Sequence, residues 1–589
     1  MTVKRLTFSA LSALLCASCA GGANVKAVHR AGQTFITWPE VERLPGGAQL
    51  TWGVTKQILG KSKITYRIYA HTAPITAASL AKAEQIGEVK PLSGWNVNGR
   101  NVETLIAQAM VKPDQMGELA RNYNGFIRLW HMDHPRMDRY PLKRFVINEK
   151  AGPLAPDTGL FVAQPLRAGV RHYAVVVCRD GTPDPKPLAA TGPVTETVGV
   201  GRPVCQGDGL WGPYFDYPGV RKVYVQWWPV GGPGPAAKTR SFNWSVLTPP
   251  HGPKKAPVEL YFHGGNYSYA KPNLKLMRNS VQIAAHDWPF SGWYGYRDAD
   301  GVVRNHTQKR IAAFLDWAKD NLPIDPDRVL AVGGDGAAMM ALSRPDLFAY
   351  VVVTGFDRSG GVLNPKAAKK YTAAWGAKSA EVKDQAGRAN WEWAELDKVL
   401  PAKEGADLPL FVCRGRSWGG VKGWGKGRGR FYAAMKKIRQ PLFAHWAWGG
   451  KLFAPDKYTG LWRGLDITRT TPVPAFANSS LDAEGEGRGQ TNTVYAWKDV
   501  KDTADAFEIT ITGRASTFDL TLRRVQTFKP KPDETFKWTV AYLPAPRAKT
   551  TPKPVSGTVI VDKFGLITLK QLKLEGKSGG MRLKIMRVK

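Results

Sequence analysis

Asp335 is the residue whose type and surroundings most clearly suggest chemistry, and it lies within a run of small residues, Gly333-Gly334-Asp335-Gly336-Ala337. A strand-like apolar run, 328–332, precedes this turn, and a helical pattern over 336–343 follows it. A carboxylate, unlike a hydroxyl, is nucleophilic at neutral pH without a neighbouring base. Asp335 could therefore attack a substrate directly. Alternatively, it could accept backbone hydrogen bonds at the start of the helix, where negative charge is favoured.

A second segment could stabilise a developing negative charge. The strand-like run 258–262 ends in His263-Gly264-Gly265. Because glycine has no side chain, its backbone amide can approach an oxyanion closely. The amide of Gly336, directly after Asp335, would face the same oxyanion. These two segments together predict a site at the carboxyl edge of a sheet.

In order and spacing, the two segments resemble the α/β-hydrolase fold of secreted esterases and polyhydroxybutyrate-depolymerase-like hydrolases. In that family a G-x-S-x-G turn carries the nucleophilic serine, and an acid and a histidine follow it along the chain. The resemblance covers 201–471 and implies a mostly parallel sheet covered on both faces. Here Asp335 replaces the serine.

The other two positions of the triad have also changed. The resemblance places the acid near Ser417 or Trp418, yet no Asp or Glu occurs between Asp407 and Asp456. The histidine is expected after the last strand, where this chain has Lys451. The resemblance therefore implies a hydrolase fold with a degraded catalytic triad, and whether the chain is an enzyme stays open.

An active enzyme is the alternative. The elbow aspartate of haloalkane dehalogenases and epoxide hydrolases is the nucleophile, and Asp335 resembles it, with Asp357 and His445 as assisting groups. Asp357 follows a strand-like run, and that position supplies the acid in some members of the fold. His445 is the last histidine of the chain, but the pattern of 442–446 places it within a strand, too early for a catalytic histidine.

A basic, glycine-rich stretch replaces the expected acid loop. It lies at the edge where open α/β sheets bind ligands, so it could hold carboxylate or sulfate groups. Trp293 and two further tryptophans nearby could stack on sugars, although core packing is the more common role of any one such aromatic residue. A solvated loop is the alternative for the cations. The candidate ligand-binding residues are Arg416, Trp418, Lys422, Trp424, Lys451 and Trp293.

The net charge favours anionic partners. The chain carries 83 Lys+Arg against 48 Asp+Glu, which gives a formal net charge of +35. Such an imbalance attracts anions over long range, although a general surface bias would produce it too. No nucleic-acid-binding motif occurs. We therefore expect an anionic or carbohydrate-type polymer as the partner, with no nucleic acid, no cofactor and no metal, because the histidines lack the spacing of a metal site.

Three regions must position these residues. Alternating strand patterns over 27–200 resemble a fibronectin type III-like β region with an insertion at 93–140. Region 201–471 alternates strands and helices, which predicts the mostly parallel sheet of the α/β-hydrolase-like domain. Short strands return over 472–589 and predict a C-terminal β-sandwich domain.

The first residues have the pattern of an export signal. Lys4 and Arg5 precede an apolar run, and small residues end the segment, so 1–22 is expected to be a bacterial-type signal peptide. The resulting location would be periplasmic, cell-surface or extracellular. Cys19 could carry a lipid anchor, with simple cleavage as the alternative. No later run is long enough to span a membrane. Cys178 and Cys205 could form a disulfide, whereas Cys413 is expected in a buried strand.

Overall fold

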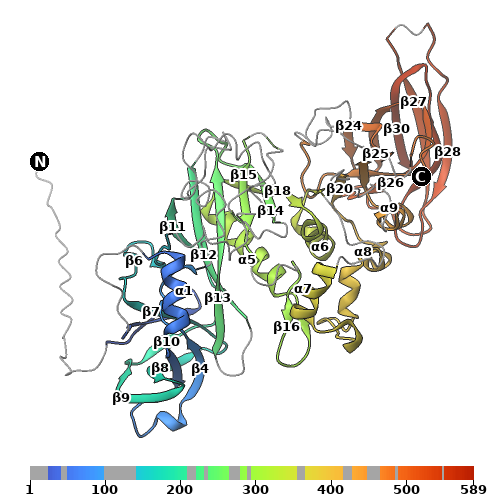
Figure 1. Ribbon diagram of the computed structural model, residues 1–589. Coiled ribbons are helices and arrows are strands. Elements are labelled where there is room, and N and C mark those ends of the chain that lie inside the picture. Colours follow the sequence, from blue (N-terminus) through green and yellow to red (C-terminus); the bar gives the residue numbers. More distant parts are fainter. Residues whose placement is uncertain are drawn as a thin grey trace, which may run out of the picture.

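The structure is a computed structural model of the 589-residue chain. It describes residues 24–41, 50–97, 141–208, 220–230, 236–263, 269, 277, 279–287, 293–354, 365–414, 428–446, 465–483, 489–546 and 549–588. The described elements form an elongated molecule, with N-terminal strands at one end, helices and strands in the middle and C-terminal strands at the other end (Figure 1).

The N-terminal region consists of β-strands in two sheets that share a core. One sheet contains β1 (Lys26–Arg30), β2 (Gln33–Pro39) and β7 (Thr158–Pro165). The other contains β3 (Ile64–His71), β4 (Glu84–Val89), β8 (Gly169–Arg179), β9 (Thr182–Ala190) and β10 (Val194–Glu196). Side chains alternate across a strand, so one face of each sheet contributes to the core, as with Ile36 and Phe161 against Tyr66 and Val175. The predicted strands are confirmed, while the fibronectin type III-like arrangement stays a prediction.

Smaller elements complete this region. They are α1 (Trp52–Lys61), the 3-10 helix η1 (Leu80–Lys82), β5 (Val146–Asn148) and β6 (Gly152–Pro153).

The first sheet continues into the central region. Strand β7 pairs with β13 (Ala236–Thr248), where Lys238 lies opposite Ala163. Strand β12 (Val220–Pro229) pairs with β13 and with β11 (Val204–Asp208), and 13 of the described strands belong to this sheet. The expected boundary at residue 200 thus separates segments that share one hydrogen-bonded sheet.

The central part of this sheet has a defined strand order. From β12 it runs β12, β13, β15 (Val281–Ala285), β14 (Ala256–Phe262), β18 (Ile324–Gly333), β19 (Tyr350–Thr354), β20 (Leu410–Arg414) and β21 (Leu442–Trp446). Counted along the chain from β12, the order is 1-2-4-3-5-6-7-8. Strand β13 is antiparallel to both of its neighbours, and the strands from β15 to β21 are parallel. This is the strand order of an α/β-hydrolase sheet, so the fold expected for the centre of the chain is confirmed.

Helices cover one face of the central sheet. The main ones are α5 (His306–Asn321), α6 (Asp335–Ser343), α7 (Pro365–Trp375), α8 (Leu396–Val399) and α9 (Arg428–Lys437). Short pieces between them are β16 (Tyr296–Arg297), β17 (Val303–Arg304), η5 (Pro345–Leu347), η6 (Lys378–Ala380), η7 (Asn390–Ala394) and η8 (Leu400–Lys403). Phe314 of α5, Met340 of α6 and Met435 of α9 share a core with Ala331 of β18.

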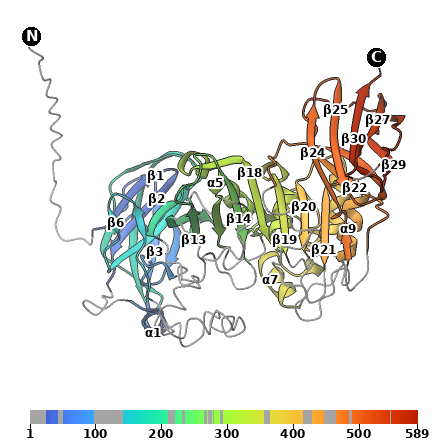
Figure 2. The same ribbon diagram turned by 90° about the horizontal axis from the view of Figure 1, so that it is seen from above.

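The C-terminal strands cover the opposite face. One sheet contains β22 (Val473–Ala477), β26 (Ser516–Arg523) and β29 (Thr568–Leu574), and the other contains β24 (Tyr495–Asp502), β25 (Ala506–Gly513), β27 (Thr535–Pro544), β28 (Val555–Ile560) and β30 (Ser578–Arg587). Val332, Val352, Val412 and Phe443 of the central sheet belong to the same core as Phe476 of β22. Figure 2 shows the central strands in a row between the two β-rich ends. The C-terminal region is thus packed against the sheet.

The structure corrects the possible disulfide. Cys178 and Cys205 are both free. Cys178 is fully buried in β8, whereas Cys205 lies in β11, a strand of the other sheet. Cys413 lies in β20 and is buried, as expected. Within the described part of the chain, no helix has the length and apolar character needed to cross a membrane.

Candidate functional site

The predicted elbow is a tight connection from β18 to α6. Gly333 ends the strand, Gly334 caps the helix, and Asp335 is its first residue. A Cβ atom on Gly333 would lie 2.8 Å from the carbonyl oxygen of Phe262 on the adjacent β14. Glycine is therefore required at position 333 because β18 lies close to β14 here, whether or not catalysis takes place.

Asp335 has the position of a helix-terminal residue. The nucleophile of a hydrolase elbow sits on a strained turn that exposes its side chain. Asp335 belongs to α6, is partly buried, and is not among the non-glycine residues with a positive φ. Its carboxylate lies at the positive end of the helix dipole, where it stabilises the helix. This geometry agrees with the structural role that the sequence left open.

Trp293 packs over the elbow and is buried, with 4% of its surface exposed. Its ring lies 5.0 Å from that of Phe262 and 4.5 Å from that of His263, measured between centroids. A Cβ atom on Gly336 would lie 2.3 Å from its Cδ1 atom. The indole thus contacts both segments whose amides would form an oxyanion hole. Its burial favours the core-packing role for Trp293, and stacking on a ligand stays a prediction.

A buried ion pair holds the segment that carries Trp293. Asp287 follows β15, and its Oδ1 atom accepts hydrogen bonds from Thr307 Oγ1 at 2.9 Å and Arg310 Nη2 at 3.1 Å. Its Oδ2 atom accepts a hydrogen bond from the Trp293 amide at 3.2 Å. Trp293 has a φ of 60°, an unfavourable value for a bulky residue, which this contact helps to maintain.

Both charges of this pair are fully buried. The Asp287 and Arg310 side chains have 0% of their surface exposed. Burial raises the pKa of Asp287, against the opposing effect of Arg310, and lowers the pKa of Arg310 to about 10. The guanidinium also lies 3.9 Å above the centre of the Phe242 ring. Sequence reasoning missed this pair. The available signal was an arginine on the apolar face of the predicted helix over 308–321.

His263 is engaged in the same network. Its Nε2 atom accepts a hydrogen bond from the Asp287 amide at 3.1 Å. A nitrogen that accepts this hydrogen bond carries no proton, and it cannot take one from a substrate while the contact persists. His263 thus orients the segment after β15. Gly264 and Gly265, its expected partners in an oxyanion hole, lie outside the described residues.

His445 lies within β21, as its sequence pattern predicted. In register, Gly333 aligns with Val353, Cys413 and Ala444, so His445 is level with Gly334 across the sheet. Three strand spacings, together about 14 Å, separate their backbones. On its other side His445 pairs with Gln490 of the short strand β23 (Gly489–Thr491).

The orientation of His445 also differs from that of a catalytic base. Leu442 and Ala444 belong to the core on the α6 side, whereas Phe443 belongs to the core shared with the C-terminal region. Because side chains alternate along a strand, His445 is on the same face as Phe443. The histidine and Asp335 are therefore not brought together.

Several expected site residues lie outside the described residues. They are Asp357, Arg416, Trp418, Lys422, Trp424 and Lys451, together with Cys19 and the rest of 1–22. Their roles stay predictions. Among the residues that the structure describes, no group of three or more His, Cys, Asp or Glu side chains could hold a metal ion.

The strand order, the antiparallel β13 and the elbow after β18 define an α/β-hydrolase-like domain. No family model matches the chain, and no curated protein matches it. Solved structures with partial similarity include an S-formylglutathione hydrolase from Agrobacterium tumefaciens, with 15% identity over 41% of this chain and 90% of that chain and a TM-score of 0.31. Another is the fluorophosphonate-binding serine hydrolase FphF of Staphylococcus aureus, with 14% identity over 39% of this chain and 91% of that chain and a TM-score of 0.29. At such values the similarity says nothing about activity.

The contact between Gly336 and Trp293 leads to a test of the elbow's packing. Gly336→Ala should lower the free energy of unfolding by about 1–3 kcal/mol, because the added methyl group overlaps the indole ring in a full core. A matched control is Gly60→Ala in α1, where a Cβ atom meets nothing within 4 Å. That change should stabilise the protein by about 0.5–1 kcal/mol, since alanine favours a helix. Denaturant unfolding measures both, and equal stability of Gly336→Ala and the native protein would contradict the packing described.

Proposed function

We propose that this protein is a catalytically degenerate α/β-hydrolase-fold protein that is exported and binds an anionic or carbohydrate-type polymer. The observation that carries the loss of catalysis is the position of His445. It is the only histidine after Asp335 in the sequence, and the triad order of the fold requires a histidine there. Its place within β21 rather than after it, on the face opposite α6, supports a protein without a histidine base at the elbow.

The form of the elbow supports the same conclusion. An ester formed on Asp335 would need a histidine to activate water for its hydrolysis. The nearest described candidate by fold position is His263, and its Nε2 atom is used by the Asp287 amide. Asp335 itself has helical geometry beneath a packed Trp293. These features favour a structural role for the carboxylate.

The charge of the chain supports a polyanionic partner. A net charge of +35 produces a positive field that raises the local concentration of anions. The signal-like residues 1–22 place the protein outside the cytoplasm in this proposal, where acidic polysaccharides are available partners. A lipid anchor at Cys19 is compatible with it, since such an anchor would hold a binding protein at the cell surface.

The catalytic half of the proposal is tested with aryl esters of short acids. The native protein, Asp335→Ala and Asp335→Asn are expected to hydrolyse them at the same rate, no faster than a heat-inactivated sample. Hydrolysis by the native protein that both substitutions abolish, with melting temperatures unchanged, would show that Asp335 is a nucleophile and would overturn this half.

The binding half is tested with a glycan panel that includes polyuronate, sulfated and neutral polymers of similar length. Retention on the two anionic polymers, and not on the neutral one, is expected at about 0.15 M salt, where long-range attraction is already screened. Equal retention on all of them, or on none, would contradict the proposal.

A further inference from the structure

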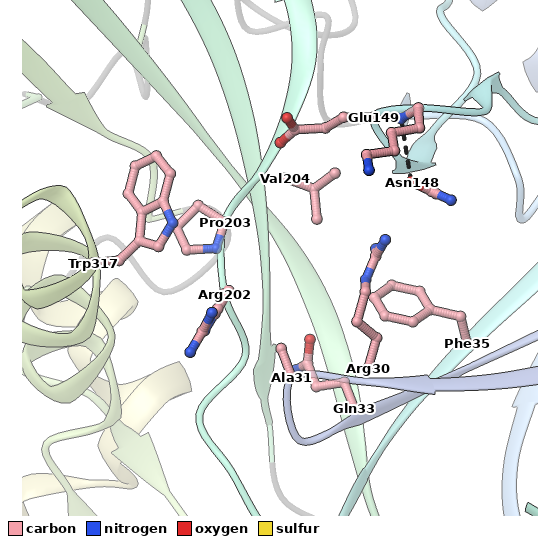
Figure 3. A pocket seen from close by; sticks show the side chains of 11 residues that line it. Arg30, Ala31, Gln33, Phe35, Asn148, Glu149, Arg202, Pro203, Val204 and Trp317 are labelled. Carbon is pink, nitrogen blue, oxygen red and sulfur yellow. Dashed lines mark hydrogen bonds between the residues drawn. The ribbon is translucent and has the colours of Figure 1, made fainter. Parts of the chain in front are cut away.

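A cavity of about 310 Å³ lies between the N-terminal strands and the hydrolase-like domain. Four segments line it: the β1–β2 hairpin, the turn after β5, the segment 202–204 that leads into β11, and helix α5 through Trp317 (Figure 3). A cavity built from segments so distant in sequence is fixed by the tertiary fold.

The floor and one side of the cavity are apolar and well supported. Phe35 and Val204 are buried core residues, and Pro203 is buried beside them. The Phe35 ring packs edge-on against Trp227, with centroids 5.3 Å apart. Trp317 is half-buried, and its ring lies 5.1 Å from that of Tyr224. Of these rings, Phe35 and Trp317 line the cavity and form its apolar wall, which suits the apolar face of a sugar ring.

Three cations surround this wall. Arg30, Lys150 and Arg202 line the cavity and are exposed, and within the described part of the chain none of them forms an ion pair. The Arg30 guanidinium lies 5.3 Å from the centre of the Phe35 ring. In Figure 3 the Arg30 side chain extends from the hairpin toward the turn that carries Asn148 and Glu149. Like charges around one cavity repel one another, and an anion between them relieves that repulsion.

The one carboxylate of the cavity is already engaged. Glu149 Oε1 accepts a hydrogen bond from the Cys205 amide at 2.8 Å, which ties the turn to β11. The Asn148 side chain accepts a hydrogen bond from the Lys150 amide at 3.2 Å, which fixes the shape of the same turn. The cavity thus combines a fixed turn, an apolar wall and an excess of positive charge.

From this combination we infer that the cavity binds one anionic sugar unit of a polymer, with its carboxylate or sulfate group at Arg30 and Lys150 and its ring against Trp317. Arg202 contributes a further cation. This inference rests on the proposed function and names a site for it whose lining residues are not those of the elbow.

The test measures binding of an oligouronate, a sulfated oligosaccharide and a neutral oligosaccharide of equal length by calorimetry, with a single-stranded oligonucleotide as a further arm. The double variant Arg30→Gln/Lys150→Gln should bind the anionic sugar at least about tenfold more weakly, because charge-assisted contacts are lost. The control Lys537→Gln/Arg582→Gln removes the same charge from exposed positions on the C-terminal strands and should change binding less than about twofold. The uronate and sulfate arms identify which anionic group the site prefers.

The possible failures are distinguishable. If the native protein binds none of the anionic sugars, the proposed function and the cavity both fail. If it binds them and both double variants weaken binding equally, only the cavity assignment fails. If the oligonucleotide binds as strongly as the anionic sugar, and with the same dependence on Arg30 and Lys150, the assignment of a sugar ligand is overturned. The cavity would then bind polyanions in general. Arg202→Gln, at an exposed position outside any strand, serves as a second variant if the double variant melts at a lower temperature.

Discussion

Arg310→Met should lower the free energy of unfolding by about 3–5 kcal/mol, because it leaves the Asp287 carboxylate buried without its counter-ion. Asp287 Oδ1 would keep only the Thr307 hydroxyl as a donor. The methionine fills much of the arginine volume, so the loss reports the missing charge more than a cavity. Denaturant unfolding at neutral pH measures it.

The pH dependence of this variant should identify the cause. Burial already raises the pKa of Asp287, and without Arg310 that pKa rises further. The folded variant then holds a proton that the unfolded chain releases above its ordinary pKa near 4. Because the folded state binds more protons, stability should fall as pH rises from about 4, by up to about 1.4 kcal/mol per pH unit, until the folded-state pKa is passed.

Two controls separate this effect from general damage to α5. Lys319→Met on the same helix removes a cation whose partner, Asp316, is on the surface, and it should cost less than about 1 kcal/mol. Arg310→Met combined with Asp287→Asn should recover part of the loss and abolish the pH slope. A flat pH profile for the single variant would contradict the buried charge as the cause.

Arg524→Met should lower the free energy of unfolding by about 3 kcal/mol, because it removes the donors of three backbone carbonyls in a buried interface. Arg524 follows β26 and has 3% of its surface exposed. Its Nη2 atom donates to Phe348 at 2.8 Å, and its Nη1 atom donates to Ala349 at 2.7 Å and to Thr468 at 3.3 Å. The residue therefore joins the C-terminal strands to the start of β19.

The change should be visible within the central sheet as well. Amide hydrogen exchange of β19 is expected to accelerate in Arg524→Met, since its entry into the sheet loses a support. Arg524→Lys should recover only part of the stability, because an ammonium cannot reproduce the planar fork of donors. Arg514→Met, at an exposed turn of the same region, is the matched control. Unchanged β19 exchange in Arg524→Met would mean that the C-terminal region does not support the sheet.

The sequence was informative where structure depends on local periodicity. The apolar run of β14, the strand before the elbow and the amphipathic α5 all lie where their patterns indicated, and so do the C-terminal strands. The elbow was found because close approach of β18 and β14 requires glycine at position 333, and such a requirement is visible in the sequence. The strand position of His445 was predictable for the same local reason.

Contacts between distant segments were not predictable in this way. Strand β7 pairs with β13, although the change in sequence pattern near residue 200 places them in different regions. This pairing is made by backbone hydrogen bonds, so the side-chain pattern of the sequence does not indicate it. On the face of the central sheet opposite the helices, side chains of the sheet and of the C-terminal strands share one core, so the C-terminal region packs directly against the sheet. The partnership of Asp287 with Arg310 depends on how β15 and α5 are placed, which neither segment encodes by itself.

The sequence alone determined that this chain contains strand–helix alternation, a glycine-rich turn that carries Asp335, and a large excess of positive charge. These follow from residue type and spacing. Only the tertiary structure decided that Trp293 is buried over the elbow, that His445 is on the face opposite α6, and that three cations from distant segments line one cavity. The physical reason is the same in each case. The burial of a side chain, the side of the sheet on which it lies and the charges that surround it all depend on how the elements pack in space.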